Sequence, residues 1–198
     1  MSEKINYNQI IEKKIADFKG KKSLLLHSCC GPCSASVIEK LQPYFEITVF
    51  YYNPNIYPDA EYFKRRDEQQ KYLAKMNVPF VEGDYEAEIF FRLAKGLELE
   101  VEGGQRCLKC FEMRLRKTAE FGEEYNFQFL ATTLTVSPHK NVNYINTLGQ
   151  TLEKEYNIEY LVSDFKKKEG YKRSLEISQK EKFYRQDYCG CIYSQRKK

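Results

Sequence analysis

Short apolar runs alternate along this chain with longer segments of mixed polarity. The runs SLLLH (23–27), EITVFYY (46–52), FQFLA (127–131) and EYLVS (159–163) have the length and composition of buried strands, and a shorter strand is expected near 79–81. The segments between the runs predict helices over residues 34–41, 59–76, 86–95, 108–125 and 142–156. The pattern is that of strands connected by helices.

This alternation predicts an α/β fold in which a doubly wound, mainly parallel sheet carries helices on both faces. Such three-layer sandwiches include the nucleotide-hydrolase-like and PP-loop-like folds, and their ligands bind beyond the carboxyl ends of the strands. Because no repeat or linker interrupts the pattern, residues 1–198 are expected to form a single domain. Residues 166–198, predicted to be helical or irregular, would cover the ligand-binding edge.

Positive charge is concentrated late in the chain. The net charge is +4, but residues 166–198 contain eleven Lys or Arg against four Asp or Glu. A basic segment can steer an anionic partner such as tRNA, although a solvated polar tail has the same composition. No apolar run approaches the roughly 18 residues of a membrane span, and the opening MSEKINYNQ lacks signal-peptide features, so we expect a cytoplasmic protein without a membrane partner.

Seven cysteines fall into three tight groups, HSCCGPC, RCLKC and YCGC. Their odd number and their grouping argue against a disulfide scaffold, and in a cytosolic chain they indicate metal binding or redox chemistry. Within the first group, Cys30-Gly31-Pro32-Cys33 is the active-site tetrapeptide of thioredoxins, so a thioredoxin-like dithiol oxidoreductase is one alternative. The adjacent Cys29, the second C-x-x-C and the absence of a Trp before the pair favour a different use.

Cys107 and Cys110 form the second C-x-x-C at the expected start of a helix, where free backbone N–H groups favour added negative charge. Together with two thiols of the first group they can supply four thiolates to one centre. An iron–sulfur cluster is favoured over zinc because the site lies at the ligand-binding edge and leaves one thiol of the first group unused beside it. A zinc-stabilised nucleic-acid-binding module without catalysis is the alternative.

The third group is Cys189-Gly190-Cys191. A disulfide across one residue is strained and readily reduced, which suits a catalytic pair, whereas two free thiols are the simpler interpretation. His27 ends the first expected strand, where it can either polarise the site or take part in structural hydrogen bonds, and His139 lies in a loop. No SGGxDS or GxxxxGK phosphate loop is present, which argues against an ATP-dependent thiolation enzyme.

Five segments, in order from Leu24 to Ser194, together resemble the epoxyqueuosine reductases of the QueH type: LLLHSCCGPC, YYNPNIYPDAEYFKRR, GGQRCLKCFEMRL, ATTLTVSPHK and DFKKKEGYKRSLEISQKEKFYRQDYCGCIYS. The resemblance implies deoxygenation of the epoxide of epoxyqueuosine, at the wobble position of tRNA, to give queuosine. It also implies a redox-active disulfide between the last two cysteines, no cobalamin, and a [4Fe-4S] cluster on Cys29, Cys30, Cys107 and Cys110.

Deoxygenation of an epoxide takes two electrons and two protons, whereas a four-iron cluster ordinarily moves one electron at a time. We therefore expect the Cys189/Cys191 pair to act with the cluster, and Cys33 is a candidate ligand for a second iron beside it. An electron donor of unknown identity is also required. Candidates for contacts with phosphates of the anticodon loop are the basic residues Arg65, Arg66, Arg114, Arg116, Lys166, Lys167, Lys168, Lys172, Arg173 and Arg185.

Overall fold

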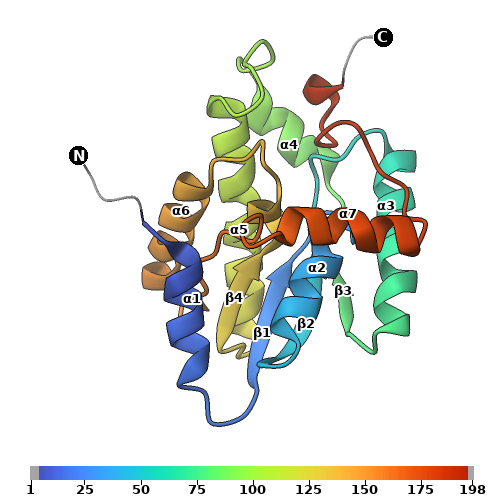
Figure 1. The fold of residues 1–198 in the computed structure, drawn as a ribbon. Helices are drawn as coiled ribbons and strands as arrows, with labels where there is room; N and C mark the ends of the chain where they lie inside the picture. The colour runs from blue at the N-terminus through green and yellow to red at the C-terminus, as the bar shows by residue number, and fades with distance from the viewer. Residues whose placement is uncertain (1–4, 196–198) are drawn as a thin grey trace.

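Five parallel strands form one sheet with helices on both of its faces (Figure 1). The computed structural model describes residues 5–195. The strand order is β3-β2-β1-β4-β5 and each neighbouring pair is parallel, which confirms the doubly wound sheet expected from the sequence. The strands are β1 (Lys22–His27), β2 (Phe45–Tyr51), β3 (Phe80–Glu82), β4 (Phe129–Thr132) and β5 (Glu159–Tyr160).

Helices cover both faces of the sheet. One face packs against α1, α2, α3 and α7, and the opposite face packs mainly against α5 and α6. None of the helices in the described part of the chain is both long and apolar enough to cross a bilayer. The helices are α1 (Tyr7–Ala16), α2 (Gly31–Leu41), α3 (Asp59–Lys75), α4 (Ala87–Ala94), α5 (Gln105–Glu124), α6 (Val142–Glu155) and α7 (Gly170–Lys180), with 3-10 turns η1 (Thr133–Val136) and η2 (Ile192–Ser194).

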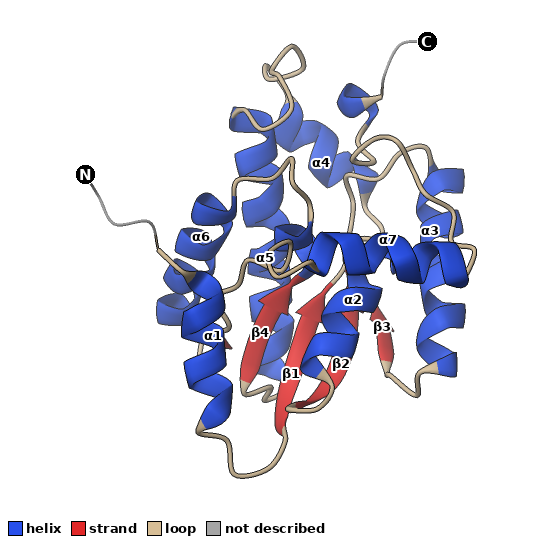
Figure 2. Cartoon of the chain, in the orientation of Figure 1, coloured by secondary structure: helices blue, strands red, loops and turns tan. Residues whose placement is uncertain are grey.

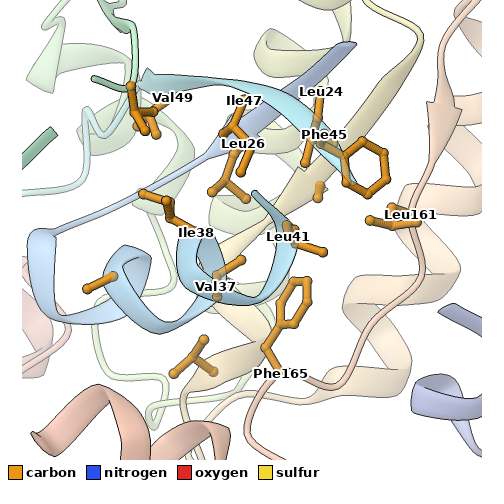
Figure 3. Close-up of a cluster of buried hydrophobic side chains, with 14 of the residues drawn as sticks. Leu24, Leu26, Val37, Ile38, Leu41, Phe45, Ile47, Val49, Leu161 and Phe165 are labelled. Carbon is orange, nitrogen blue, oxygen red and sulfur yellow. The ribbon is translucent and has the colours of Figure 1, made fainter. Parts of the chain in front are cut away.

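The central strand β1 is buried on both faces because its leucines alternate between them. Leu24 and Leu26 belong to the larger core, where they pack near Ile38 of α2 (Figure 3). Leu25 belongs to a separate cluster on the opposite face, against which Phe121 of α5 packs. Burial on both faces makes β1 a rigid base for the cysteine loop that follows it.

The edge strand β5 is shorter than the sequence pattern predicts. Residues 160–163 of the predicted strand are buried, but regular strand pairing ends at Tyr160. Beyond it, the amide of Asn146 in α6 accepts from the backbone N–H of Ser163 at 3.0 Å and donates to its carbonyl at 2.9 Å. A side chain therefore replaces a neighbouring strand as the hydrogen-bonding partner, which satisfies buried backbone groups at the edge of the sheet.

The chain reverses its direction of travel across the sheet at β1. From β1 it proceeds outward through β2 to β3, and it then returns to β4 on the other side of β1. The loops that leave the carboxyl ends of β1 and β4 therefore diverge and leave a crevice between them. The helix α7 packs against α2 and extends toward α3 (Figure 2).

Candidate active site and metal centre

Three cysteine sulfurs meet at the carboxyl end of β1. The Sγ atoms of Cys29, Cys30 and Cys33 all lie within 4.8 Å of one another, and those of Cys29 and Cys30 are 3.8 Å apart. Within residues 5–195 this is the one set of three or more Cys, His, Asp or Glu ligand atoms that is so compact. Cys29 and Cys30 are buried, and Cys33 is half-buried.

The start of α2 brings these thiols together. The helix begins at Gly31, three residues earlier than the sequence pattern predicts, so Cys30 is its N-cap and Cys33 lies in its first turn. The thiols of Cys30 and Cys33 donate hydrogen bonds to Cys29 and hold the pKa of Cys29 well below its usual value. The same interaction with Cys29 raises the pKa of Cys30 to about 12. The loop therefore concentrates one negative charge on Cys29, and a metal would displace the remaining thiol protons.

Hydrogen bonds among buried amide and hydroxyl side chains fix the cysteine loop in place. The side chain of Asn53 donates to the carbonyl of Ser28 at 2.8 Å. Gln69 of α3 donates to the hydroxyls of Ser28 and Ser34 at 2.6 and 2.9 Å. Sequence reasoning missed this support, although Asn53 lies in the turn-rich segment NPNIYP after β2. These bonds fix the backbone on which the three sulfurs depend.

The second C-x-x-C lies in the first two turns of α5. The backbone N–H of Gly103 donates to the Sγ of Cys107 at 3.2 Å. Cys110 is buried, and burial raises its pKa to about 12. Its neighbours in a small buried cluster are Phe90, Ala94 and Cys191. One cysteine of the C-terminal pair therefore packs in the same cluster as one cysteine of α5.

Arg114 connects the two sets of thiols. It is buried (1% exposed), its Nε donates to Nε2 of His27 at 3.3 Å, and its Nη2 donates to the side-chain oxygen of Asn53. Burial alone would lower the pKa of Arg114, but its interactions with the neighbouring cysteines Cys110 and Cys29 outweigh this and raise it. Arg114 thus carries a permanent positive charge between the β1 loop and α5.

His27 has a structural role in this arrangement. It is fully buried, and its Nδ1 lies 2.9 Å from the hydroxyl of Thr132 at the end of β4. Burial and the charge of Arg114 lower the pKa of His27 to about 3, so the ring is neutral. A neutral ring that accepts from Arg114 through Nε2 must carry its proton on Nδ1 and donate it to Thr132. His27 therefore orients Arg114.

The structure groups the four cysteines expected to bind the cluster in two sets. Cys29 and Cys30 lie together with Cys33, whereas Cys107 and Cys110 lie on α5 and do not join this compact set. Terminal ligands of a four-iron cluster bind different corners of a cube, so their sulfurs are necessarily further apart than the ligands of one ion. Four thiols on two elements, with Arg114 between them to offset negative charge, are a donor set that fits such a cluster.

The Cys189-Gly190-Cys191 turn is fixed by contacts with α3 and with the loop before it. Arg65 donates to the carbonyl of Cys189 at 3.2 Å, and the N–H of Tyr57 donates to the carbonyl of Gly190 at 2.9 Å. Both cysteines are free thiols in this structure. Cys189 lines a cavity, whereas Cys191 is buried beside Cys110. The turn therefore presents one thiol to the cavity and the other to the α5 pair.

A cavity of about 320 Å³ lies at the carboxyl ends of β1 and β4. Its walls include Cys29 and Cys33 from the β1 loop and Lys140 from the segment after η1. Tyr171 of α7 and residues 185–189 supply the opposite wall, and Gln186 donates to the Sγ of Cys30 at 3.2 Å. A second hollow, near residues 123–128 and 153–159, lies at the other end of the sheet, away from every cysteine.

Several basic residues expected to contact phosphate are engaged inside the protein. Arg65 and Arg114 are each 1% exposed, so their assignment as phosphate contacts is wrong. Arg196, Lys197 and Lys198 of the basic segment lie outside the described residues. Lys167 and Arg185 have no ion-pair partner among residues 5–195, and Arg185 lines the cavity. Six other candidates form ion pairs with carboxylates: Arg66, Arg116, Lys166, Lys168, Lys172 and Arg173.

Replacing Gly190 with alanine is expected to displace the cysteine turn and to lower turnover at least tenfold. Gly190 has φ +119°, and an added Cβ would lie 3.0 Å from both Arg65 Nη1 and Ile56 Cγ1. Backbone strain of this kind costs about 1–3 kcal/mol. Gly20→Ala is the matched control, because Gly20 has φ +95° but no heavy atom within 4 Å of the added Cβ. G20A should lose stability in thermal unfolding yet keep its activity, and equal activity loss in both variants would contradict the role of the turn.

Comparisons with known proteins agree over almost the whole chain. A family model described as "Epoxyqueuosine reductase QueH" matches residues 24–197. The protein of that name from Staphylococcus epidermidis is 40% identical, covering 98% of this chain and 86% of its own. The one from Streptococcus pyogenes serotype M1 is 41% identical over 98% and 79% of the two chains, and the one from Thermotoga maritima is 31% identical over 87% and 90%.

Solved structures show the same fold at low identity. The U34-tRNA thiolase NcsA from Methanococcus maripaludis, solved with its [4Fe-4S] cluster, has a TM-score of 0.59 at 14% identity, covering 96% of this chain and 68% of its own. A predicted subunit of tRNA methyltransferase from Methanocaldococcus jannaschii has a TM-score of 0.53 at 18% identity, over 77% and 76%. With the family match over residues 24–197, the sequence comparisons establish that the chain belongs to the epoxyqueuosine reductase QueH family.

Proposed function

We propose that this protein reduces the epoxide of epoxyqueuosine, at the wobble position of tRNA, to the cyclopentene of queuosine. The observation that carries the proposal is the cavity at the carboxyl ends of β1 and β4, where Cys29, Cys33 and Cys189 line one space in a chain of the QueH family. The reaction consumes two electrons and two protons, forms a carbon–carbon double bond and releases the oxygen as water. The site must therefore supply two electrons and two protons to the bound nucleoside.

The proposed cofactor is a [4Fe-4S] cluster held by Cys29, Cys30, Cys107 and Cys110. Its support is the donor set of thiols on two facing elements and the buried charge of Arg114, which offsets the negative charge of thiolate ligands. When bound, such a cluster supplies electrons one at a time. Cys33, in the first turn of α2 and beside Cys29, is the proposed protein ligand of a second iron.

The proposed role of Cys189 and Cys191 is to supply electrons for the two-electron reduction of the epoxide. Oxidation of two thiols to a disulfide releases two electrons and two protons, which equals the number that the epoxide consumes. Cys189 faces the cavity and Cys191 lies beside Cys110, so the pair adjoins both the substrate space and the proposed cluster ligands. An electron donor must then reduce the disulfide for the next cycle.

The walls of the cavity bind and shield the substrate in this proposal. Tyr171 and Tyr188 offer aromatic faces for a base, and Arg185 at the rim can contact a phosphate of the anticodon loop. Binding of tRNA should weaken steeply with salt if several cations contribute. The proposed location is the cytoplasm, where tRNA substrates are present.

A single ion bound by the compact Cys29/Cys30/Cys33 set is the second candidate centre. Three sulfurs within 4.8 Å suit a zinc ion in a non-catalytic nucleic-acid-binding module. The thioredoxin-like alternative is disfavoured, because the first thiol of its pair needs a lowered pKa and that of Cys30 is raised to about 12.

The deciding experiment uses protein purified without oxygen. Iron and sulfide are measured first, and the protein is then incubated with a reductant and an anticodon stem-loop that contains epoxyqueuosine. We expect about four irons and four sulfides in the cluster of each chain, and mass spectrometry should show that the nucleoside has lost one oxygen atom. A colourless, zinc-loaded protein that binds the RNA but leaves the epoxide intact would support the zinc module instead.

A further inference from the structure

Lys140 places an ammonium group in the wall of the cavity. It follows the 3-10 turn η1 and directly precedes Asn141, whose side chain caps α6 by accepting from the N–H of Tyr144 at 3.1 Å. The helix cap and the turn fix the backbone on both sides of Lys140. Lys140 lines the cavity together with Cys29, Cys33 and Cys189.

The ammonium of Lys140 is free to bind a ligand. Among residues 5–195 no carboxylate lies within 4.0 Å of its Nζ, and no protein acceptor takes a hydrogen bond from it. The other cations near the cavity differ: Arg114 is engaged by His27 and Asn53, whereas Arg185 lies exposed at the rim. Lys140 is therefore the half-buried cation of the cavity wall whose ammonium has no ion-pair or hydrogen-bond partner among residues 5–195.

Lys140 carries a positive charge, because the ordinary pKa of a lysine ammonium lies well above neutral pH. Arg114 and the neutral ring of His27 face this group, and the charge of Arg114 opposes that of Lys140. An ammonium without a protein partner keeps its hydrogen-bond donors for a polar group that enters the cavity.

We propose that Lys140 is a catalytic residue whose ammonium donates a hydrogen bond to the epoxide oxygen of the bound nucleoside. This inference rests on the proposed function. As both carbon–oxygen bonds break, two electrons enter the substrate and negative charge builds up on the oxygen that leaves. Lys140 stabilises that charge and is unchanged at the end of the cycle, while the overall reaction takes up two protons and releases water.

A fixed cation aimed at developing negative charge accelerates the chemical step, because the interaction is stronger in the transition state than in the substrate complex. A phosphate anchor would act differently. It would strengthen the binding of substrate and product tRNA equally, and its loss would change KM and the salt dependence of binding while leaving kcat in place. The two roles of Lys140 are therefore distinguishable by kinetics.

The test compares K140M and K140R with the control K71M, since Lys71 is an exposed lysine on α3. All proteins are prepared without oxygen, and kcat is expressed per bound cluster from the measured iron and sulfide. We expect K140M to lose about 10²–10³-fold in kcat with KM changed less than threefold, K140R to retain part of the activity, and K71M to match the unaltered protein.

A binding measurement gives a second readout that needs no turnover. Without reductant, the unaltered protein should bind a stem-loop containing epoxyqueuosine about tenfold more tightly than one containing queuosine, which lacks the oxygen, and K140M should lose this preference. An unchanged kcat per cluster in K140M, or a higher KM with kcat retained, would overturn the role of Lys140. Failure of the proposed function is recognised separately, because the unaltered protein would then leave the epoxide intact.

Discussion

Replacing Cys110 with alanine should remove bound iron and activity together, whereas replacing Cys33 with alanine should leave the four-iron cluster in place. Cys110 is buried on α5, across from Cys29, and its loss leaves one corner of the cluster without a thiolate. Cys33 lies in the compact set but is not among the four proposed ligands. Iron and sulfide analysis with visible absorption spectra of the two variants measures the difference.

The contrast between these two variants decides which cysteines hold the centre. If C33A loses all its metal while C110A keeps it, the ligands are Cys29, Cys30 and Cys33, and the centre is a single ion on one loop. Thermal unfolding is the necessary control, because C110A also opens space beside Phe90 and Ala94. A folded C110A protein without iron supports the four proposed ligands.

Replacing Cys189 and Cys191 with serine should abolish turnover while the visible absorption of the cluster remains. The pair lies outside the proposed ligand set, so its removal leaves the cluster in place, but the substitution eliminates the thiols that would supply electrons and protons. Because the two thiols act as one unit, each single variant should lose nearly as much activity as the double variant, more than about 100-fold.

The measurement for this second variant is turnover on epoxyqueuosine-containing RNA, together with iron content. C189A/C191A is the matched variant, because it removes the thiols without adding a hydroxyl beside the buried Cys110. Both double variants should behave alike. Full activity in either one, with the cluster retained, would reject the electron relay and assign these cysteines a structural role.

Local pattern is sufficient to place the first cysteine group. The run SLLLH is apolar on both faces, as a central parallel strand requires, so the cysteines that follow it must lie at the carboxyl edge of the sheet. The same reasoning overestimates β5, because Leu161 and Val162 are apolar and buried although the backbone of Ser163 bonds to Asn146. Hydrophobicity predicts which residues are buried, but it does not predict which group forms hydrogen bonds with their backbone.

The functions of the arginines depend on contacts between distant parts of the sequence. The sequence predicts that Arg65 and Arg114 are surface cations, because each lies in a charged helical segment. Their partners, the carbonyl of Cys189 and the ring of His27, are 124 and 87 positions away along the chain. The cavity position of Lys140 likewise follows from the packing of α7 and residues 185–189 over the sheet, which no local pattern specifies.

The wall formed by residues 185–189 has a consequence for assembly of the holoprotein. These residues come after every strand in the chain, so the sheet and α5 can fold before the segment docks on α3 and on the cysteine loop. We therefore expect the sulfurs of the β1 loop to be accessible to a donor of iron and sulfide until this segment docks. If the proposed cluster is bound, docking encloses it, so the order of synthesis provides an interval for loading the cofactor.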